Sequence, residues 1–164
     1  MPCLTCLSRA LLYPMNLLKQ QLHQRCVAYV QERMHAAQQA INEAQQASND
    51  DTKSSAGDKY ETGREMAQQE TNRNLTQLNK ANKLMVLLNQ ISTNGQGTTA
   101  DAGSIVITNS GLFYLSISAG TFVLDGKTYF AISPGSPIGM KMKGCKAGDE
   151  FSLNSKAYTV MDVL

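Results

Sequence analysis

Residues 34–48 read MHAAQQAINEAQQAS, and small or apolar side chains recur in this stretch at spacings of three and four. Such spacing places them on one stripe of a helix, which is the pattern of a coiled-coil seam. With looser spacing the stripe continues toward the N-terminus. The sequence therefore predicts a helix from about Met15 to about Ser48, roughly 50 Å long at 1.5 Å per residue. The stripe residues are Leu18, Leu22, Cys26, Val30, Met34, Ala37, Ile41, Ala44 and Ser48.

The helical pattern stops at residues 49–52, which read NDDT. Asn and Asp side chains compete with helical hydrogen bonds and favour caps and turns. Ser54 or Ser55 is then placed to cap a second helix that ends near residues 90–92. Two long helices joined by a short break predict an antiparallel hairpin. The second helix carries its small or apolar stripe at Tyr60, Ala67, Leu75, Leu78, Ala81, Met85 and Leu88.

The chain changes character at residues 93–103, TNGQGTTADAG, which read as a linker. After it, Phe113, Leu115 and Ile117 alternate with polar or aromatic neighbours in the period of a strand. Asp125-Gly126 between apolar runs predicts a tight hairpin, and residues 154–156 predict a second one. Residues 137–143 predict one short helix, which Gly144 stops. Further strands are expected at 104–108, 122–124, 128–132, 150–153 and 157–163.

These patterns predict an α+β chain with a helical coiled-coil hairpin at 15–92 and a linker at 93–103. A small antiparallel β domain with one short helix is expected at 104–164. Residues 1–14 are expected to form a disordered extension, with Met15 as the native start, because Pro14 interrupts helix continuity.

Composition narrows the function classes. The formal net charge is +2 over 164 residues, so there is no global attraction to nucleic acid. No apolar run is long enough to span a membrane, and Ser8 and Arg9 interrupt the mildly apolar N-terminus, which makes a poor secretory signal. The cysteines show no disulfide framework, and Cys3-x-x-Cys6 lacks the second pair that a structural zinc site needs. These features predict a cytoplasmic protein without membrane contact.

An enzyme with its own active site is not expected. No Ser or Cys lies in a nucleophile motif, and His23 and His35 both fall on the first predicted helix as surface residues. No cofactor of its own is predicted either.

Two stretches resemble the bacterial Gre transcript-cleavage factors. Ile41–Ala44, followed by Ser54–Glu61, is similar to the tip of that family's helical hairpin. Ile132–Gly139, followed by Gly144–Glu150, looks like the family's C-terminal signature of Ser-Pro-Ile/Leu-Gly and then Gly-x-x-x-Gly-Asp. The resemblance covers nearly the whole chain from Met15 onward.

The resemblance implies a hairpin joined to a domain like the FK506-binding proteins, bound at the secondary channel of RNA polymerase. It implies that the C-terminal domain grips the channel rim and that the hairpin tip approaches the catalytic Mg²⁺, with indirect contact to nascent RNA and DNA. Acidic tip residues of the family help to hold a metal shared with the polymerase, since Mg²⁺ prefers oxygen ligands. The implied rim contacts are Ser136, Pro137, Ile138, Gly139, Lys141 and Lys143, and the implied tip residues are Asp50, Asp51, Lys53, Asp58, Tyr60 and Glu61.

The sequence departs from the family at the tip, which usually reads Asp-Leu-Ser-Glu-Asn-Ala-Glu-Tyr. Aligned without a gap on Tyr60, the family's acids fall on Lys53, Ala56 and Lys59. A lysine does not coordinate Mg²⁺, so Asp50 and Asp51 are the metal ligands expected if the register shifts locally. The alternative is that these aspartates only form the turn.

We therefore expect an elongation regulator with weak or no cleavage stimulation. A different reading of the same pattern is a generic coiled-coil module whose β domain binds another protein.

Overall fold

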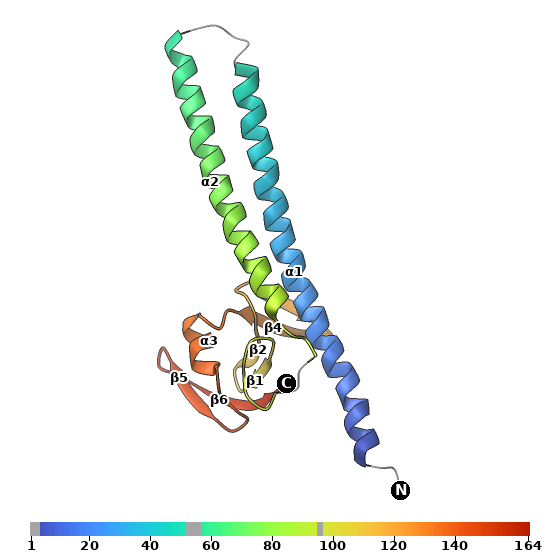
Figure 1. The fold of residues 1–164 in the computed structure, drawn as a ribbon. Coiled ribbons are helices and arrows are strands. Elements are labelled where there is room, and N and C mark those ends of the chain that lie inside the picture. Colours follow the sequence, from blue (N-terminus) through green and yellow to red (C-terminus); the bar gives the residue numbers. More distant parts are fainter. Residues whose placement is uncertain (1–3, 52–56, 95–96) are drawn as a thin grey trace. The chain divides into compact units, whose positions relative to one another are not determined.

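The computed structural model describes residues 4–51, 57–94 and 97–164 (Figure 1). Side-chain environments are described for residues 16–47, 61–94 and 97–164. The chain forms two compact units, and each is treated by itself. One unit contains Ala28–Val86, and the other contains Met1–Val27 together with Leu87–Leu164. The ends of both helices therefore belong with the sheet, whereas the sequence predicts a boundary at the 93–103 linker.

Helix α1 spans Leu4–Asp51 and helix α2 spans Gly57–Gln90, which confirms the predicted helical pair. In the Ala28–Val86 unit, the buried side chains are Val30, Ala37, Ile41 and Ala81. Three of these lie on the stripe predicted from the spacing in the first helix. The seam is thin because half of these side chains are alanines, which bury little area per turn.

Helix α1 begins earlier than the sequence predicts. It runs from Leu4 through Pro14, where a disordered extension is expected. A proline in a helix interior removes one backbone hydrogen bond and disfavours the turn before it, but neighbouring turns can still continue the helix. The local proline signal alone therefore misplaces the helix start.

The second unit contains a six-stranded sheet in the order β3-β4-β2-β1-β6-β5. β2 and β4 pair in parallel, and every other neighbouring pair is antiparallel. The expected purely antiparallel sheet is thus wrong at one pairing, because β4 returns from the β3 edge to lie beside β2 in the same direction. The strands are β1 Ile105–Thr108, β2 Gly111–Leu115, β3 Gly120–Leu124, β4 Lys127–Ile132, β5 Glu150–Leu153 and β6 Lys156–Val163.

Two tight turns join the hairpins where they are predicted. Asp125 and Gly126 have φ values of 50° and 73° between β3 and β4, and Asn154 and Ser155 have 51° and 62° between β5 and β6. Positive φ at both central positions is the type I′ turn, whose twist matches that of the flanking strands.

One face of the sheet forms the core with the short helix α3, Pro137–Met142. Met142 is buried together with Val106, Phe113 and Leu115 from the central strands. Aromatic rings extend this core: Phe113 stacks on Phe130 at 5.4 Å, and Phe151 stacks on Tyr158 at 5.0 Å between ring centroids. Tyr158 also meets Phe113 edge to face at 6.4 Å, so the rings tie β4, β2, β6 and β5 together.

The end of α1 that belongs to this unit contacts Ser116, the residue after β2. The Sγ of Cys26 lies 3.4 Å from the hydroxyl of Ser116, and both groups are buried. Leu22, Cys26 and Leu88 are fully buried. Within the described residues, no helix is both apolar and long enough to cross a bilayer.

Candidate functional site

The residues of the Ser-Pro-Ile-Gly signature form the N-terminal cap of α3. The hydroxyl of Ser136 accepts a hydrogen bond from the Gly139 N–H at 3.1 Å and donates one to the Ser133 carbonyl at 2.6 Å. Pro137 occupies the first helical turn, where its missing N–H needs no partner. Serine and proline are therefore explained by helix initiation, independently of any partner.

Position 139 requires glycine because there is no space for a side chain. Its backbone lies so close to the Ser133 carbonyl that an added Cβ would overlap that oxygen, and it would approach Ser136 Oγ to 2.9 Å and Pro134 Cα to 3.0 Å. Gly139 is itself buried. The glycine thus locks the loop at 133–136 against α3 and fixes the direction in which the helix presents its outer side chains.

The outer surface of α3 combines one large apolar side chain with two cations. Met140 is 62% exposed, and Lys141 and Lys143 are exposed on the same helix and at its C-terminal end. Neither lysine forms an ion pair in the part of the chain that the structure describes. We call Met140, Lys141 and Lys143 the α3 surface. An exposed methionine beside unpaired cations suits contact with an acidic protein surface.

The implied rim contacts divide into two groups. Ser136 and Gly139 serve the internal structure of the cap, and Ile138 packs against the core. Pro137 and the α3 surface are exposed. The second group is the more accessible to a partner.

The hairpin tip is only partly described. Asp50 and Asp51 are the last two residues of α1, while Asp58 and Tyr60 lie in the first turn of α2. Their side chains and all of Lys53 lie outside the described residues, whereas Glu61 is exposed on α2. Among the residues that the structure describes, no group of three or more His, Cys, Asp or Glu is placed to hold a metal ion. The Asp50 and Asp51 metal site stays a prediction.

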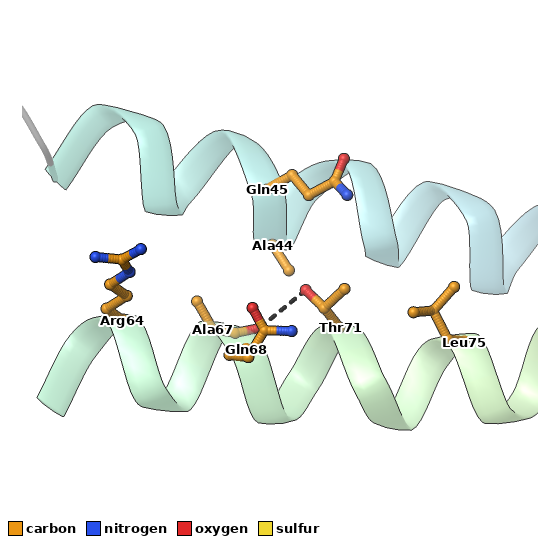
Figure 2. Close-up of a pocket in the computed structure, with 7 residues that line it drawn as sticks. All are labelled: Ala44, Gln45, Arg64, Ala67, Gln68, Thr71 and Leu75. Atoms are coloured by element: carbon orange, nitrogen blue, oxygen red, sulfur yellow. Dashed lines mark hydrogen bonds between the residues drawn. The ribbon is translucent and has the colours of Figure 1, made fainter. Parts of the chain in front are cut away.

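Below the tip, the two helices of the Ala28–Val86 unit enclose an open groove of roughly 520 Å³. Ala44 and Gln45 line it from α1, and the other five residues come from α2 (Figure 2). Ala44 and Ala67 both line this groove, and their methyl groups are too small to fill the space between the helices. The Thr71 hydroxyl donates a hydrogen bond to the Ala67 carbonyl oxygen at 2.9 Å, so its methyl group lines the groove. The remaining lining residues are Arg64, Gln68 and Leu75.

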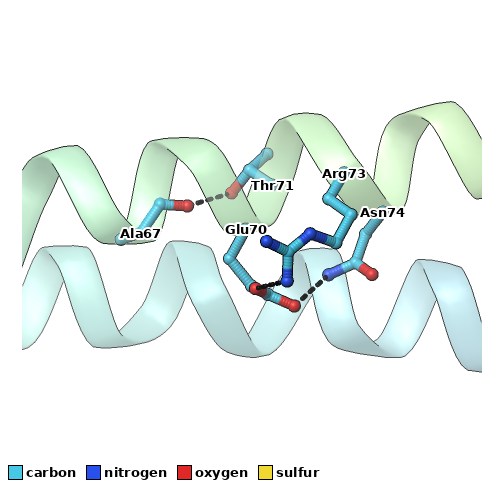
Figure 3. Close-up of polar contacts among 5 residues, drawn as sticks. All are labelled: Ala67, Glu70, Thr71, Arg73 and Asn74. Atoms are coloured by element: carbon cyan, nitrogen blue, oxygen red, sulfur yellow. Dashed lines mark hydrogen bonds and ion pairs between the residues drawn. The ribbon is translucent and has the colours of Figure 1, made fainter.

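Polar side chains on the helices pair mainly with neighbours one turn away. Glu70 accepts from Arg73 at 3.3 Å and from Asn74 at 3.4 Å (Figure 3). Gln39 donates to Glu43 at 2.9 Å, and Gln38 and Gln68 make similar contacts with Asn42 and Asn72. Each such exposed pair stabilises the helix by about 0.2–0.5 kcal/mol. These contacts support the helices locally.

The sheet unit contains a buried polar group that the sequence patterns do not predict. The Tyr114 side chain is fully buried, and its hydroxyl has no hydrogen-bond partner among the described residues. Burial, and then the neighbouring Cys26, raise the pKa of Tyr114. Burial also raises the pKa of Cys26, and the hydrogen bond between Cys26 and Ser116 partly offsets this rise. Both groups therefore stay protonated at neutral pH and do not supply a nucleophile.

Two titratable side chains of α1, Lys19 and His23, lie in buried or half-buried positions. His23 is half-buried, and its Nδ1 is buried without a hydrogen-bond partner among the described groups, which corrects its expected place on the surface. Lys19 is only 3% exposed. Burial lowers the pKa of both side chains. A helical spacing of i, i+4 and i+7 places Lys19, His23 and Cys26 on one face, and this spacing is the signal by which they could have been found.

Comparisons with protein-family models, with characterised proteins and with solved structures found no match.

Proposed function

We propose that this chain is a cytoplasmic, Gre-type regulator of transcription elongation that binds RNA polymerase at its secondary channel. In this proposal the α3 surface contacts an acidic part of the channel rim. The chain has no active site of its own, and its tip gives weak or no stimulation of transcript cleavage.

The observation that carries the proposal is the α3 surface, because it presents an apolar side chain and two cations from a rigidly capped helix. A surface whose backbone is held by Ser136, Pro137 and Gly139 loses little conformational entropy on binding. The cations provide attraction to an acidic partner, and the exposed methionine provides buried apolar area. The partner that the sequence resemblance implies is the polymerase.

The helical pair supplies the second part of the proposed mechanism. From Ala28 to Asp51, α1 advances about 36 Å at 1.5 Å per residue, which gives the hairpin the reach to enter a channel. Inside the channel, Lys53 occupies the position where the family carries its first acid. A cation there repels Mg²⁺, so the proposed tip occludes the channel and does not complete a two-metal site.

Capture of polymerase from cell extract tests this proposal. The full-length chain, bound to a support under mild salt, should retain RNA polymerase subunits. A triple variant, Met140→Ala with Lys141→Glu and Lys143→Glu, should weaken binding by about tenfold or more, because it reverses the charge of the contact. The matched control is Lys127→Glu with Lys156→Glu, which reverses two exposed charges elsewhere in the same unit.

Absence of polymerase subunits from the captured material would contradict the proposal. Equal weakening by the control pair would show that net charge alone governs binding, which would contradict a specific role of the α3 surface.

The groove between α1 and α2 favours a second candidate, an interaction module for a helical partner. Side chains of a third helix fit where Ala44 and Ala67 leave space. Ala67→Leu fills this space with the chain's own atoms. Loss of a captured partner in this variant, with the α3 variant unaffected, would favour the second candidate.

A further inference from the structure

The two edges of the six-stranded sheet are protected to different degrees. At one edge, β5 begins with Glu150 and contacts α3. At the other edge, β3 has the sequence Gly-Thr-Phe-Val-Leu, contains no charge or proline, and pairs only with β4. Charges, prolines and covering elements are the features that keep edge strands from pairing with another chain. β3 has no charge or proline, and its Thr121 and Val123 are exposed among the residues that the structure describes.

The turn determines which backbone groups of β3 face outward. Leu124 and Lys127 close the two-residue turn, so they form a hydrogen-bonded pair, and Phe122–Tyr129 and Gly120–Ala131 follow in the same class. Thr121 and Val123 alternate with these positions. Their N–H and C=O groups therefore point away from β4, and no backbone or side-chain hydrogen bond to them occurs among the described residues.

This arrangement is complementary to itself. If two copies of β3 run antiparallel with Phe122 opposite Phe122 of the second copy, Thr121 of each chain faces Val123 of the other. All outward N–H and C=O groups then pair, which gives four hydrogen bonds around a twofold axis. If the register shifts by one position and the twofold axis is kept, the only hydrogen-bonded pair is Thr121 with Thr121 or Val123 with Val123. That register gives two hydrogen bonds.

The side chains fit the same register. Val123 is 65% exposed and would lie beside Thr121 of the second copy, a cross-strand pair of β-branched residues. The two Phe122 rings would meet at the centre of the opposite face, where unbonded pairs bring Cα atoms to about 4.5 Å. Continuing the register places Asp125 opposite the uncharged Ala119, so no like charges face each other.

We propose that β3 is an interface for a second copy of this chain, joined by antiparallel β3–β3 pairing centred on Phe122. One short strand on each side is a small interface, so the association is weak and reversible. It uses only the sheet unit and does not depend on the proposed polymerase contact.

Sedimentation of the full-length chain from about 10 μM to about 1 mM tests this inference, since weak interfaces associate in that range. A reversible monomer–dimer equilibrium is expected. Val123→Pro removes an outward N–H from each copy, and hence two intermolecular bonds, while no bond within the hairpin is lost. At about 1 kcal/mol for each bond, dimerisation should weaken about thirtyfold.

Val123→Thr is the matched control, because it keeps the N–H and the β-branched shape, and it should dimerise like the parent chain. Val123→Lys leaves the backbone intact but adds an edge charge, and it should also weaken the dimer. In a concentration series followed by NMR, amide shifts should concentrate at Thr121, Phe122 and Val123. A chain that stays monomeric up to about 1 mM would overturn the proposal. A dimer that Val123→Pro leaves unchanged would overturn it as well.

Discussion

Gly139→Ala is the substitution whose effect the structure defines most closely. The new Cβ would overlap the Ser133 carbonyl, and it would lie 2.9 Å from Ser136 Oγ. Both atoms belong to the cap, so relief of the overlap requires the loop at 133–136 to move away from α3. The move breaks the 3.1 Å bond from the Gly139 N–H to Ser136.

The expected loss follows from these two effects. Loss of a serine cap costs about 1 kcal/mol, and overpacking of a tight backbone contact costs about 1–3 kcal/mol. Gly139→Ala should therefore lower the free energy of unfolding by about 3 kcal/mol. For the unit that contains the sheet, this loss corresponds to a thermal unfolding midpoint lower by about 15 °C.

Gly135→Ala is a matched control in the same loop. Its Cβ would meet only Ser133 Oγ, at an ordinary contact distance of 3.7 Å. Because this change reduces the freedom of the unfolded chain, it should be neutral or stabilising by up to about 1 kcal/mol. Thermal and urea unfolding, followed by near-ultraviolet circular dichroism of the sheet tyrosines, measures both variants. Equal stability of Gly139→Ala and Gly135→Ala would refute the close-packing argument.

Three further predictions concern the cap, the buried tyrosine and the helical pair. Ser136→Ala should destabilise the sheet unit by about 1 kcal/mol in urea unfolding, less than Gly139→Ala, because only the cap is lost. Tyr114→Phe should stabilise the chain by about 1 kcal/mol at neutral pH, since it removes a buried hydroxyl without a partner. A loss of stability would show that the hydroxyl is satisfied. Burial raises the pKa of Tyr114 above its ordinary 10.0, so the unfolded chain loses this proton more readily than the folded chain and the free energy of unfolding falls as the pH rises above that value. Tyr114→Phe removes this effect, so its unfolding midpoint should fall less at alkaline pH. Amides of α1 and α2 within residues 28–86 should exchange hydrogen faster than those of β1 and β2, because alanines fill much of the seam; equal protection in both would argue against a weak helical pair.

Local patterns in the sequence predict the elements well. The alternation around Phe113, the Asp125-Gly126 turn and the proline at the start of α3 each depend on interactions within a few residues. These local interactions determine the strand, the turn and the cap whatever the distant parts of the chain do. For this reason the strand boundaries agree with the structure to within a few residues.

Features that depend on distant partners were not predictable in this way. A period-two pattern shows that a strand has a buried face, but it does not identify its neighbour, so the parallel pairing of β2 with β4 was missed. The burial of Lys19 and the contact between Cys26 and Ser116 likewise arise only when α1 lies on the sheet. In the sequence, Gly139 belongs to the Ser-Pro-Ile-Gly stretch, and its steric role appears only with the Ser133 carbonyl in place.

The proposed function depends most directly on what the chain does to a stalled, backtracked transcription complex. Purified polymerase on such a template, with labelled RNA, reports cleavage and, after addition of an active cleavage factor, competition for the channel. The full-length chain should give little or no cleavage, and it should reduce cleavage by the active factor in proportion to its concentration. Strong stimulation that disappears in a variant with Asp50→Ala and Asp51→Ala would contradict the inactive tip. An active factor that works equally well with and without this chain would contradict binding at the channel itself.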